Sequence, residues 1–91
     1  MVFAKQLRER IRRGEITRTV RIWQGCHVKV GGRYRMDGGH VVVTAIAAIG
    51  LAEITGSLAR QCGFKGVVDL LKVAKHGPGR NVFLIEFHFV E

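Results

Sequence analysis

The chain has 91 residues, of which 47% are hydrophobic and 24% charged, and its formal net charge is +8. This length supports one domain and excludes a second hydrophobic core, and the composition excludes a disordered chain. The longest stretch without a charged residue, residues 38–52, is shorter than the ~20 residues that a membrane-spanning helix needs. We therefore expect a single domain, residues 1–91, with no membrane partner.

The excess positive charge lies at the beginning of the chain. Residues 1–36 contain ten Lys and Arg residues and only two acidic ones, whereas residues 37–91 contain five basic and five acidic residues. A surplus concentrated in one part of a small domain predicts a basic face, which favours nucleic acid or another polyanion as partner. A face that only keeps the protein in solution is the alternative interpretation.

The first half of the chain predicts one helix followed by strands. Phe3, Leu7 and Ile11 recur at four-residue spacing and Gly14 follows them, which predicts a helix over residues 5–13. Alternating polar and apolar residues predict strands at residues 16–23 and 33–36. Residues 40–49 are apolar on both faces, which predicts a long strand in a closed or covered sheet.

The second half predicts two helices and a final strand. Thr55 is suited to cap a helix that ends at Gly63, and a second helix ends near His76. Residues 81–90 alternate, and their phenylalanines, Phe83, Phe87 and Phe89, are predicted to lie in the core. Strands on both sides of a helical insertion predict an α+β fold, a small mixed β-barrel flanked by short helices.

The cysteines and histidines predict neither a metal nor another cofactor. Cys26 and Cys62 lack metal-ligand spacing and are predicted to be free thiols of a reducing compartment. The chain begins without the apolar stretch of a signal peptide, so we expect a cytoplasmic protein. The histidines also lack metal-ligand spacing with Cys, Asp or Glu. They are His27, His40, His76 and His88.

Four motifs are spread over almost the whole chain. They are Gly14-Glu15-Ile16-Thr17-Arg18-Thr19-Val20-Arg21, Val28-Lys29-Val30-Gly31, Leu58-Ala59-Arg60-Gln61-Cys62-Gly63-Phe64 and Val82-Phe83-Leu84-Ile85-Glu86-Phe87. In this order they resemble the motifs of the ASCH domains, small bacterial relatives of the PUA domain. The resemblance implies a PUA-like β-barrel flanked by helices, with a cleft that binds RNA or a nucleotide.

The resemblance also bears on catalysis. Some small bacterial ASCH proteins hydrolyse cytidine acylated on its exocyclic amine, with a Lys before the strand, a Thr within it and a Glu from the helical insertion. Thr19 and Arg21 match the family's Thr and strand-end Arg, but Ile16 stands at the Lys position and Cys62 at the Glu position. Thr19 is the candidate nucleophile, yet it lacks the expected base. We therefore expect binding without hydrolysis, and the double change Ile16→Lys with Cys62→Glu is the predicted route to activity.

Several candidate residues have both a functional and a structural interpretation. Arg21 is suited to grip a phosphate or stack on a base, but it is also suited to pair with Glu86. Trp23 is a candidate stacking platform for a base, with core packing as its alternative. The predicted ligand- or RNA-binding residues are Thr17, Arg18, Thr19, Arg21, Trp23, Lys29, Lys65 and Glu86, with Arg8 and Arg12 extending the basic face.

The leading functional prediction is an RNA- or nucleotide-binding ASCH-type module with Thr19, Arg21 and Lys29 in its cleft. Two alternatives belong to other classes. One is an amidohydrolase that acts on N-acylated cytidine or a related nucleoside, and the other is a basic module that docks an acidic protein partner. The sequence predicts no oligomeric state.

Overall fold

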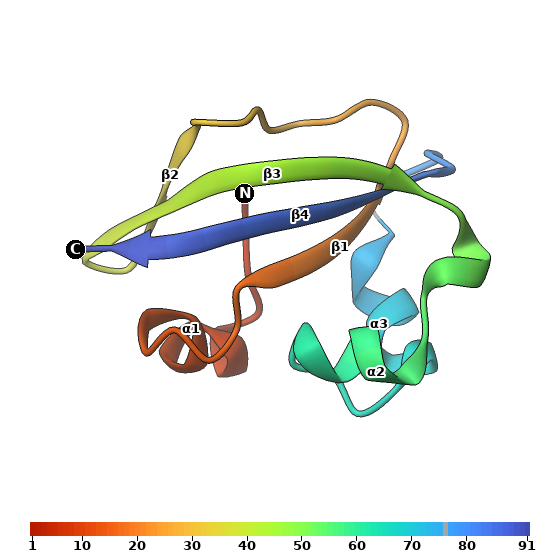
Figure 1. Ribbon diagram of the computed structural model, residues 1–91, viewed down its shortest axis with the longest axis horizontal. Helices are drawn as coiled ribbons and strands as arrows, with labels where there is room; N and C mark the ends of the chain where they lie inside the picture. Colours follow the sequence, from red (N-terminus) through yellow and green to blue (C-terminus); the bar gives the residue numbers. More distant parts are fainter. Residues whose placement is uncertain (76) are drawn as a thin grey trace.

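A four-stranded antiparallel sheet, curled into half a barrel, is flanked by short helices in the computed structural model, which describes residues 1–75 and 77–91 (Figure 1). The strands are β1 (Arg18–Trp23), β2 (Arg33–Met36), β3 (Gly39–Ile49) and β4 (Asn81–Val90), in the order β1-β4-β3-β2. The helices are α1 (Lys5–Arg12), the short 3-10 helix η1 (Leu51–Glu53), α2 (Gly56–Gln61) and α3 (Val67–Ala74). The predicted α+β class is confirmed.

The curl of the sheet brings its two edges together on the inner face. β1 and β2 lie at opposite ends of the strand order. Nevertheless, Trp23 of β1 belongs to the same cluster as Tyr34 of β2, together with Val28, Val43 and Ile85. The side chains of this inner-face cluster fill the hollow of the half-barrel, and they come from both edges of the sheet.

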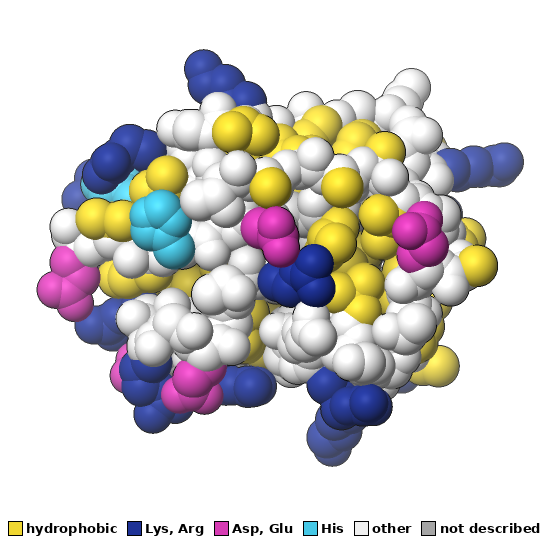
Figure 2. Space-filling view, in the orientation of Figure 1, with side chains coloured by type: hydrophobic (Ala, Val, Ile, Leu, Met, Phe, Trp, Pro, Cys, Tyr) yellow, Lys and Arg dark blue, Asp and Glu magenta, His cyan; other side chains and the backbone are white. Residues whose placement is uncertain are grey.

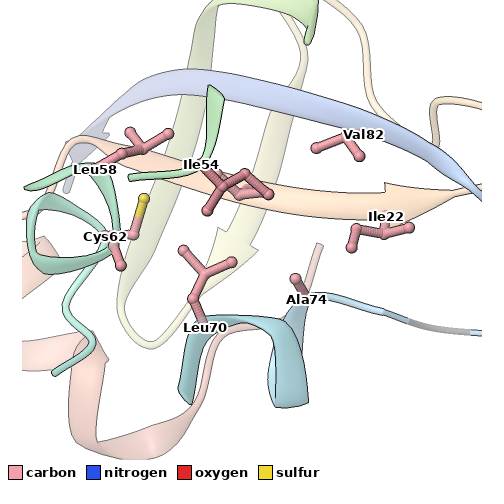
Figure 3. Packing of buried hydrophobic residues seen from close by; sticks show 9 residues of the cluster. Ile22, Ile54, Leu58, Cys62, Leu70, Ala74 and Val82 are labelled. Carbon is pink, nitrogen blue, oxygen red and sulfur yellow. The ribbon is translucent and has the colours of Figure 1, made fainter. Parts of the chain in front are cut away.

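Helices α2 and α3 cover the outer face of β1 and β4. Val20 and Ile22 of β1 and Val82 of β4 pack there against Leu58 of α2 and Leu70 of α3 (Figure 3). The helix α2 begins as its sequence predicts, because the side-chain oxygen of Thr55 accepts a hydrogen bond from the backbone N–H of Leu58 at 3.1 Å. We call this layer the outer-face cluster.

Helix α1 packs against another part of the sheet. Its predicted apolar row is confirmed, because Phe3, Leu7 and Ile11 are buried in one cluster with Phe87 of β4. The predicted end of the helix is also confirmed, since Gly14 has a φ of +78°, a conformation that favours glycine. The segment that precedes α1 is thereby held against the inner face of the sheet.

The predicted barrel is confirmed in part, because the sheet is curled into half a barrel, but the predicted mixed strand pairing is wrong. All three strand pairs are antiparallel, and the only parallel contact among the described residues is an isolated bridge between Ile22 and Lys75. Alternation of polar and apolar residues is the same in parallel and antiparallel strands, so it does not define the direction of pairing. The sheet is antiparallel and half-open.

β3 is less buried than its apolar sequence predicts. Its first residues lie between β2 and β4, but from Thr44 onward it pairs only with β4. Thr44, Ala47 and Ala48 are consequently exposed. The expectation of burial on both faces is wrong, because even in the first half only one face is buried: Val41 and Val43 are buried, whereas His40 and Val42 on the other face are half-buried.

The remaining predicted elements lie close to the observed ones. The predicted strands at residues 33–36 and 81–90 coincide with β2 and β4, and α3 ends at Ala74. The predicted helix end near His76 falls on a residue outside the described ones. Phe87 is buried as predicted, whereas Phe83 and Phe89 are half-buried.

The helices of the described residues are short. None of them has the length and apolar character that crossing a membrane requires.

Candidate anion-binding cleft beside β1

A cleft of about 190 Å³ lies between β1, the segment that leads into α1, and α3. Its walls are apolar, and among the described residues that line it only Thr19 and Arg21 have polar side chains. Both were predicted as site residues. The lining residues are Val2, Phe3, Ala4, Leu7, Thr19, Val20, Arg21, Phe64, Val73 and Ala74. We call this site the β1 cleft.

Arg21 is the buried cation of the β1 cleft. Only 8% of its surface is exposed, and burial lowers the pKa of its guanidinium because the charged form loses hydration. Its Nε donates a hydrogen bond to Thr19 Oγ1 at 3.2 Å, and its Nη2 donates to the Val2 carbonyl oxygen at 2.7 Å. Its Cζ also lies 5.0 Å from the centre of the Phe3 ring. The segment before α1 therefore holds the guanidinium in place.

No carboxylate among the described residues pairs with Arg21. A guanidinium has five N–H donors, and two protein acceptors are observed for this one within residues 1–75 and 77–91. Removing an unpaired charge from water costs several kcal/mol as an order of magnitude, even after hydrogen bonds and aromatic contacts offset part of the loss. An anion in the cleft would supply the missing counter-charge.

The ion pair between Arg21 and Glu86, the structural alternative for Arg21, is not formed. Glu86 instead pairs with Arg18, at 3.2 Å between Arg18 Nη2 and Glu86 Oε1, and Arg18 Nη1 also donates to Gln61 Oε1 at 2.8 Å. The strand register places Arg18 opposite Glu86 and Arg21 opposite Phe83. Because side chains alternate between faces, Glu86 is on the face opposite to Arg21.

The arginines of α1 do not form an unbroken positive face. Arg8 pairs with Asp37 at 3.5 Å and donates a hydrogen bond to the carbonyl oxygen of Phe3, while Arg12 pairs with Glu9 at 3.4 Å. Figure 2 shows acidic side chains beside Lys and Arg side chains along the edge where α1 lies. Arg8 and Arg12 thus have protein partners, and neither lines the β1 cleft.

Three other predicted residues lie outside the β1 cleft. Lys29 is exposed in the loop before β2 and does not line the cleft, so the expected grouping of Thr19, Arg21 and Lys29 is wrong. Trp23 is only 3% exposed and stacks on His27 at 4.4 Å between ring centres, which favours its structural interpretation. Thr17 is exposed at the start of the strand, away from the lining residues.

The positions to which the resemblance assigns a catalytic Lys and Glu are in the core. Ile16 is 2% exposed and packs with the apolar row of α1, whereas Cys62 is 2% exposed in the outer-face cluster (Figure 3). Burial raises the pKa of the Cys62 thiol to about 11, so the thiol is protonated at neutral pH. Changing these two residues to Lys and Glu would bury two charges in apolar clusters, which costs free energy unless the charges find partners.

The chemistry available in the β1 cleft favours binding. Its described lining residues include no carboxylate, imidazole or amine that would take a proton from the Thr19 hydroxyl. Within the described part of the chain, no three His, Cys, Asp or Glu side chains are grouped so that they could hold a metal ion. Thr19 and Arg21 can therefore donate hydrogen bonds to a bound group, and Arg21 can also neutralise a negative charge on it.

The apolar walls of the cleft were not identified as site residues from the sequence. Phe3 was assigned only to the apolar row of α1, and Phe64 only to a motif. The available signal was the half-buried aromatic residue directly before Lys65, beside the end of α2. Lys65 itself is exposed and lines a neighbouring groove on the α3 side.

Comparisons with known proteins identify no relative. No protein-family model matches the chain, and neither the curated proteins nor the solved structures include a significant match.

Proposed function

We propose that this protein is an RNA- or nucleotide-binding module of the ASCH type, and that the β1 cleft binds an anionic group of the ligand through Arg21 and Thr19. One observation carries the proposal: Arg21 is buried, lines a cavity and has no carboxylate partner among the described residues. A planar guanidinium fits two oxygens of a phosphate or carboxylate, and a charge-assisted hydrogen bond is roughly twice as strong as a neutral one.

The walls of the β1 cleft favour a ligand with a flat apolar part. Phe3, Leu7 and Phe64 line the cavity around the guanidinium. A nucleotide combines an aromatic base with a phosphate, and it therefore matches both the walls and the cation. A simple inorganic anion would use only the cation.

The resemblance to ASCH domains is consistent with this site. It implies a PUA-like barrel flanked by helices, and the observed sheet is half a barrel flanked by short helices. The resemblance also assigns functional positions to Thr19 and Arg21, and these are the two polar residues of the β1 cleft. The half-barrel and the position of these two residues are thus consistent with the proposal.

The proposal is tested by calorimetric titration with a ribonucleoside and with its 5′-monophosphate. We expect the monophosphate to bind more tightly, because only it supplies an anion for Arg21. Replacing Arg21 with Gln should weaken monophosphate binding by about tenfold to a hundredfold, the range expected when a charged hydrogen bond is lost. Arg18→Gln is the matched control, since Arg18 is in the same strand but pairs with Glu86.

Three results would contradict the proposal. The first is equal affinity for nucleoside and monophosphate with no effect of Arg21→Gln. The second is turnover of an N-acylated cytidine that Thr19→Val abolishes, which would establish the amidohydrolase alternative. The third is binding of an acidic peptide with no binding of any nucleotide, which would establish the docking alternative.

A further inference from the structure

A second depression, with a volume of about 410 Å³, adjoins the β1 cleft along α3. Phe64 and Val73 line both depressions, so these two side chains form the boundary between them. The remaining lining residues are Gln6, Gly63, Lys65, Asp69 and Lys72. We call this depression the α3 groove.

The α3 groove has two exposed cations. Lys65 and Lys72 are both exposed, and neither forms an ion pair with a described residue. Asp69 lies on the same side of α3 as Lys72 and Val73, because residues three and four positions apart share one face of a helix. The groove therefore has a net positive charge, and one carboxylate opposes the entry of an anion.

The size of the β1 cleft limits what it can hold. Pockets that enclose a whole small-molecule ligand have volumes of about 300 Å³ or more. The β1 cleft, at about 190 Å³, is smaller than this, so an oligonucleotide bound there must extend beyond it. The α3 groove is the neighbouring surface that shares its wall and has free ammonium groups.

We propose that the α3 groove binds the next phosphate of a single-stranded oligonucleotide whose first anionic group is held at Arg21. This inference rests on the proposed function of the β1 cleft. Lysine ammonium groups bind phosphate as point charges, and the half-buried Phe64 at the boundary presents an aromatic surface on which a base can stack. Bases stacked inside a duplex cannot enter a cavity of this size, so the ligand is a single strand.

The test compares oligouridylates of one, two and four nucleotides by calorimetry at several salt concentrations. We expect affinity to rise from one to two nucleotides and then to level off. The slope of log affinity against log salt should steepen by about 0.7 for each additional phosphate that a lysine contacts. The double variant Lys65→Gln with Lys72→Gln should remove this gain and leave mononucleotide binding unchanged.

Two further variants sharpen the test. Asp69→Asn removes the opposing carboxylate, so it should raise the affinity for the dinucleotide and leave the affinity for the mononucleotide unchanged. Lys29→Gln is the matched control, because Lys29 is an exposed lysine that lines neither the β1 cleft nor the α3 groove. It should leave the gain from the second nucleotide intact.

The proposal for the α3 groove is overturned if the dinucleotide binds no more tightly than the mononucleotide. It is also overturned if the lysine double variant behaves like Lys29→Gln, or if a tetraglutamate peptide gains as much from the two lysines as the tetranucleotide does. In each case, mononucleotide binding that still depends on Arg21 leaves the proposed function standing. Oligonucleotide binding that requires the two lysines but ignores Arg21→Gln would support the groove and contradict the role of the β1 cleft.

Discussion

The arginines on the two faces of β1 have different environments. Arg18 is at the outer face, where Glu86 and Gln61 bind its guanidinium, and the residues that follow it on that face are packed against α2 and α3. Arg21 is on the inner face, where it has a carbonyl, a hydroxyl and an aromatic ring as partners but no carboxylate among the described residues. Three residues apart in one strand, one cation is neutralised and the other is not.

This difference shows where the fold retains an energetically unfavourable feature, a buried cation without a carboxylate partner among the described residues. A sequence specifies its structure best when every buried charge is paired, and departures from this rule concentrate at functional sites. The outer-face cluster contains only apolar side chains and one thiol, whereas the β1 cleft retains a buried cation beside an open cavity. We therefore expect substitutions on the outer face to change stability, and substitutions at the cleft to change binding.

The largest effect on stability is expected at Leu70, which is fully buried in the outer-face cluster. Leu70→Ala should lower the free energy of unfolding by about 2–5 kcal/mol, because it removes buried methyl groups and leaves a cavity. Val73→Ala is the comparison, since Val73 is 43% exposed at the wall of the cleft and should cost less than about 1 kcal/mol. Urea unfolding monitored by circular dichroism measures both, and equal costs would contradict the contrast between the two faces.

The second largest effect is the pH dependence caused by Cys62. Burial raises its pKa to about 11 in the folded protein, above the value of an exposed thiol. The folded state therefore keeps this proton at a pH where the unfolded chain has lost it. This contribution to stability is fully present below about pH 9 and is lost as the pH rises toward 11, by about 2 kcal/mol as an order of magnitude.

Unfolding of the protein and of a Cys62→Ala variant, measured from pH 8 to pH 11, checks this expectation. The difference between the two curves isolates the contribution of Cys62 from those of all other groups. The wild type should lose stability more steeply than the variant. Parallel curves, or alkylation of Cys62 as fast as that of the exposed Cys26, would show that the outer face is open to solvent.

A third, smaller effect is a change in the free energy of unfolding that has opposite signs for substitutions of Arg21 and of Arg18. Arg21→Met should raise the free energy of unfolding by about 1 kcal/mol, because it replaces a buried unpaired cation with an apolar side chain of similar length. Arg18→Met should lower it by up to about 1 kcal/mol, since it breaks the pair with the half-exposed Glu86. Thermal unfolding of both variants measures the contrast. Destabilisation by Arg21→Met would mean that its present contacts already compensate the charge.

The sequence predicts local structure better than it predicts partners. The spacing of Phe3, Leu7 and Ile11 and the cap at Thr55 are local signals, and both were confirmed. The pairing of Glu86 with Arg21, offered as one of two alternatives, is wrong because the partner depends on the register between β1 and β4, which are separated by most of the chain. Alternation correctly predicts that Thr19 and Arg21 share a face, but no local pattern indicates which residue of the distant strand lies opposite.

The sequence likewise predicts some residues of the site correctly and misses others. Thr19 and Arg21 were predicted and lie together in the β1 cleft, whereas Lys29 was placed with them only by its motif and lies in a loop outside the cleft. The walls contributed by Phe3 and Phe64 depend on how the segments around α1 and α3 pack against the edge of β1. Such packing arises from tertiary contacts, which single-sequence patterns do not encode.

The smallest effect is expected at Arg12, whose ion pair with Glu9 is exposed on α1. Exposed pairs at this helical spacing contribute about 0.3–0.5 kcal/mol, so Arg12→Ala should barely change the unfolding free energy. Its effect on binding sharpens the comparison further. If the basic beginning of the chain attracted ligands as one face, Arg12→Ala would weaken mononucleotide binding in proportion to the charge removed. If binding depends on the single unpaired cation at Arg21, calorimetric titration of Arg12→Ala should give wild-type affinity at physiological salt, where charges more than about 8 Å apart are largely screened.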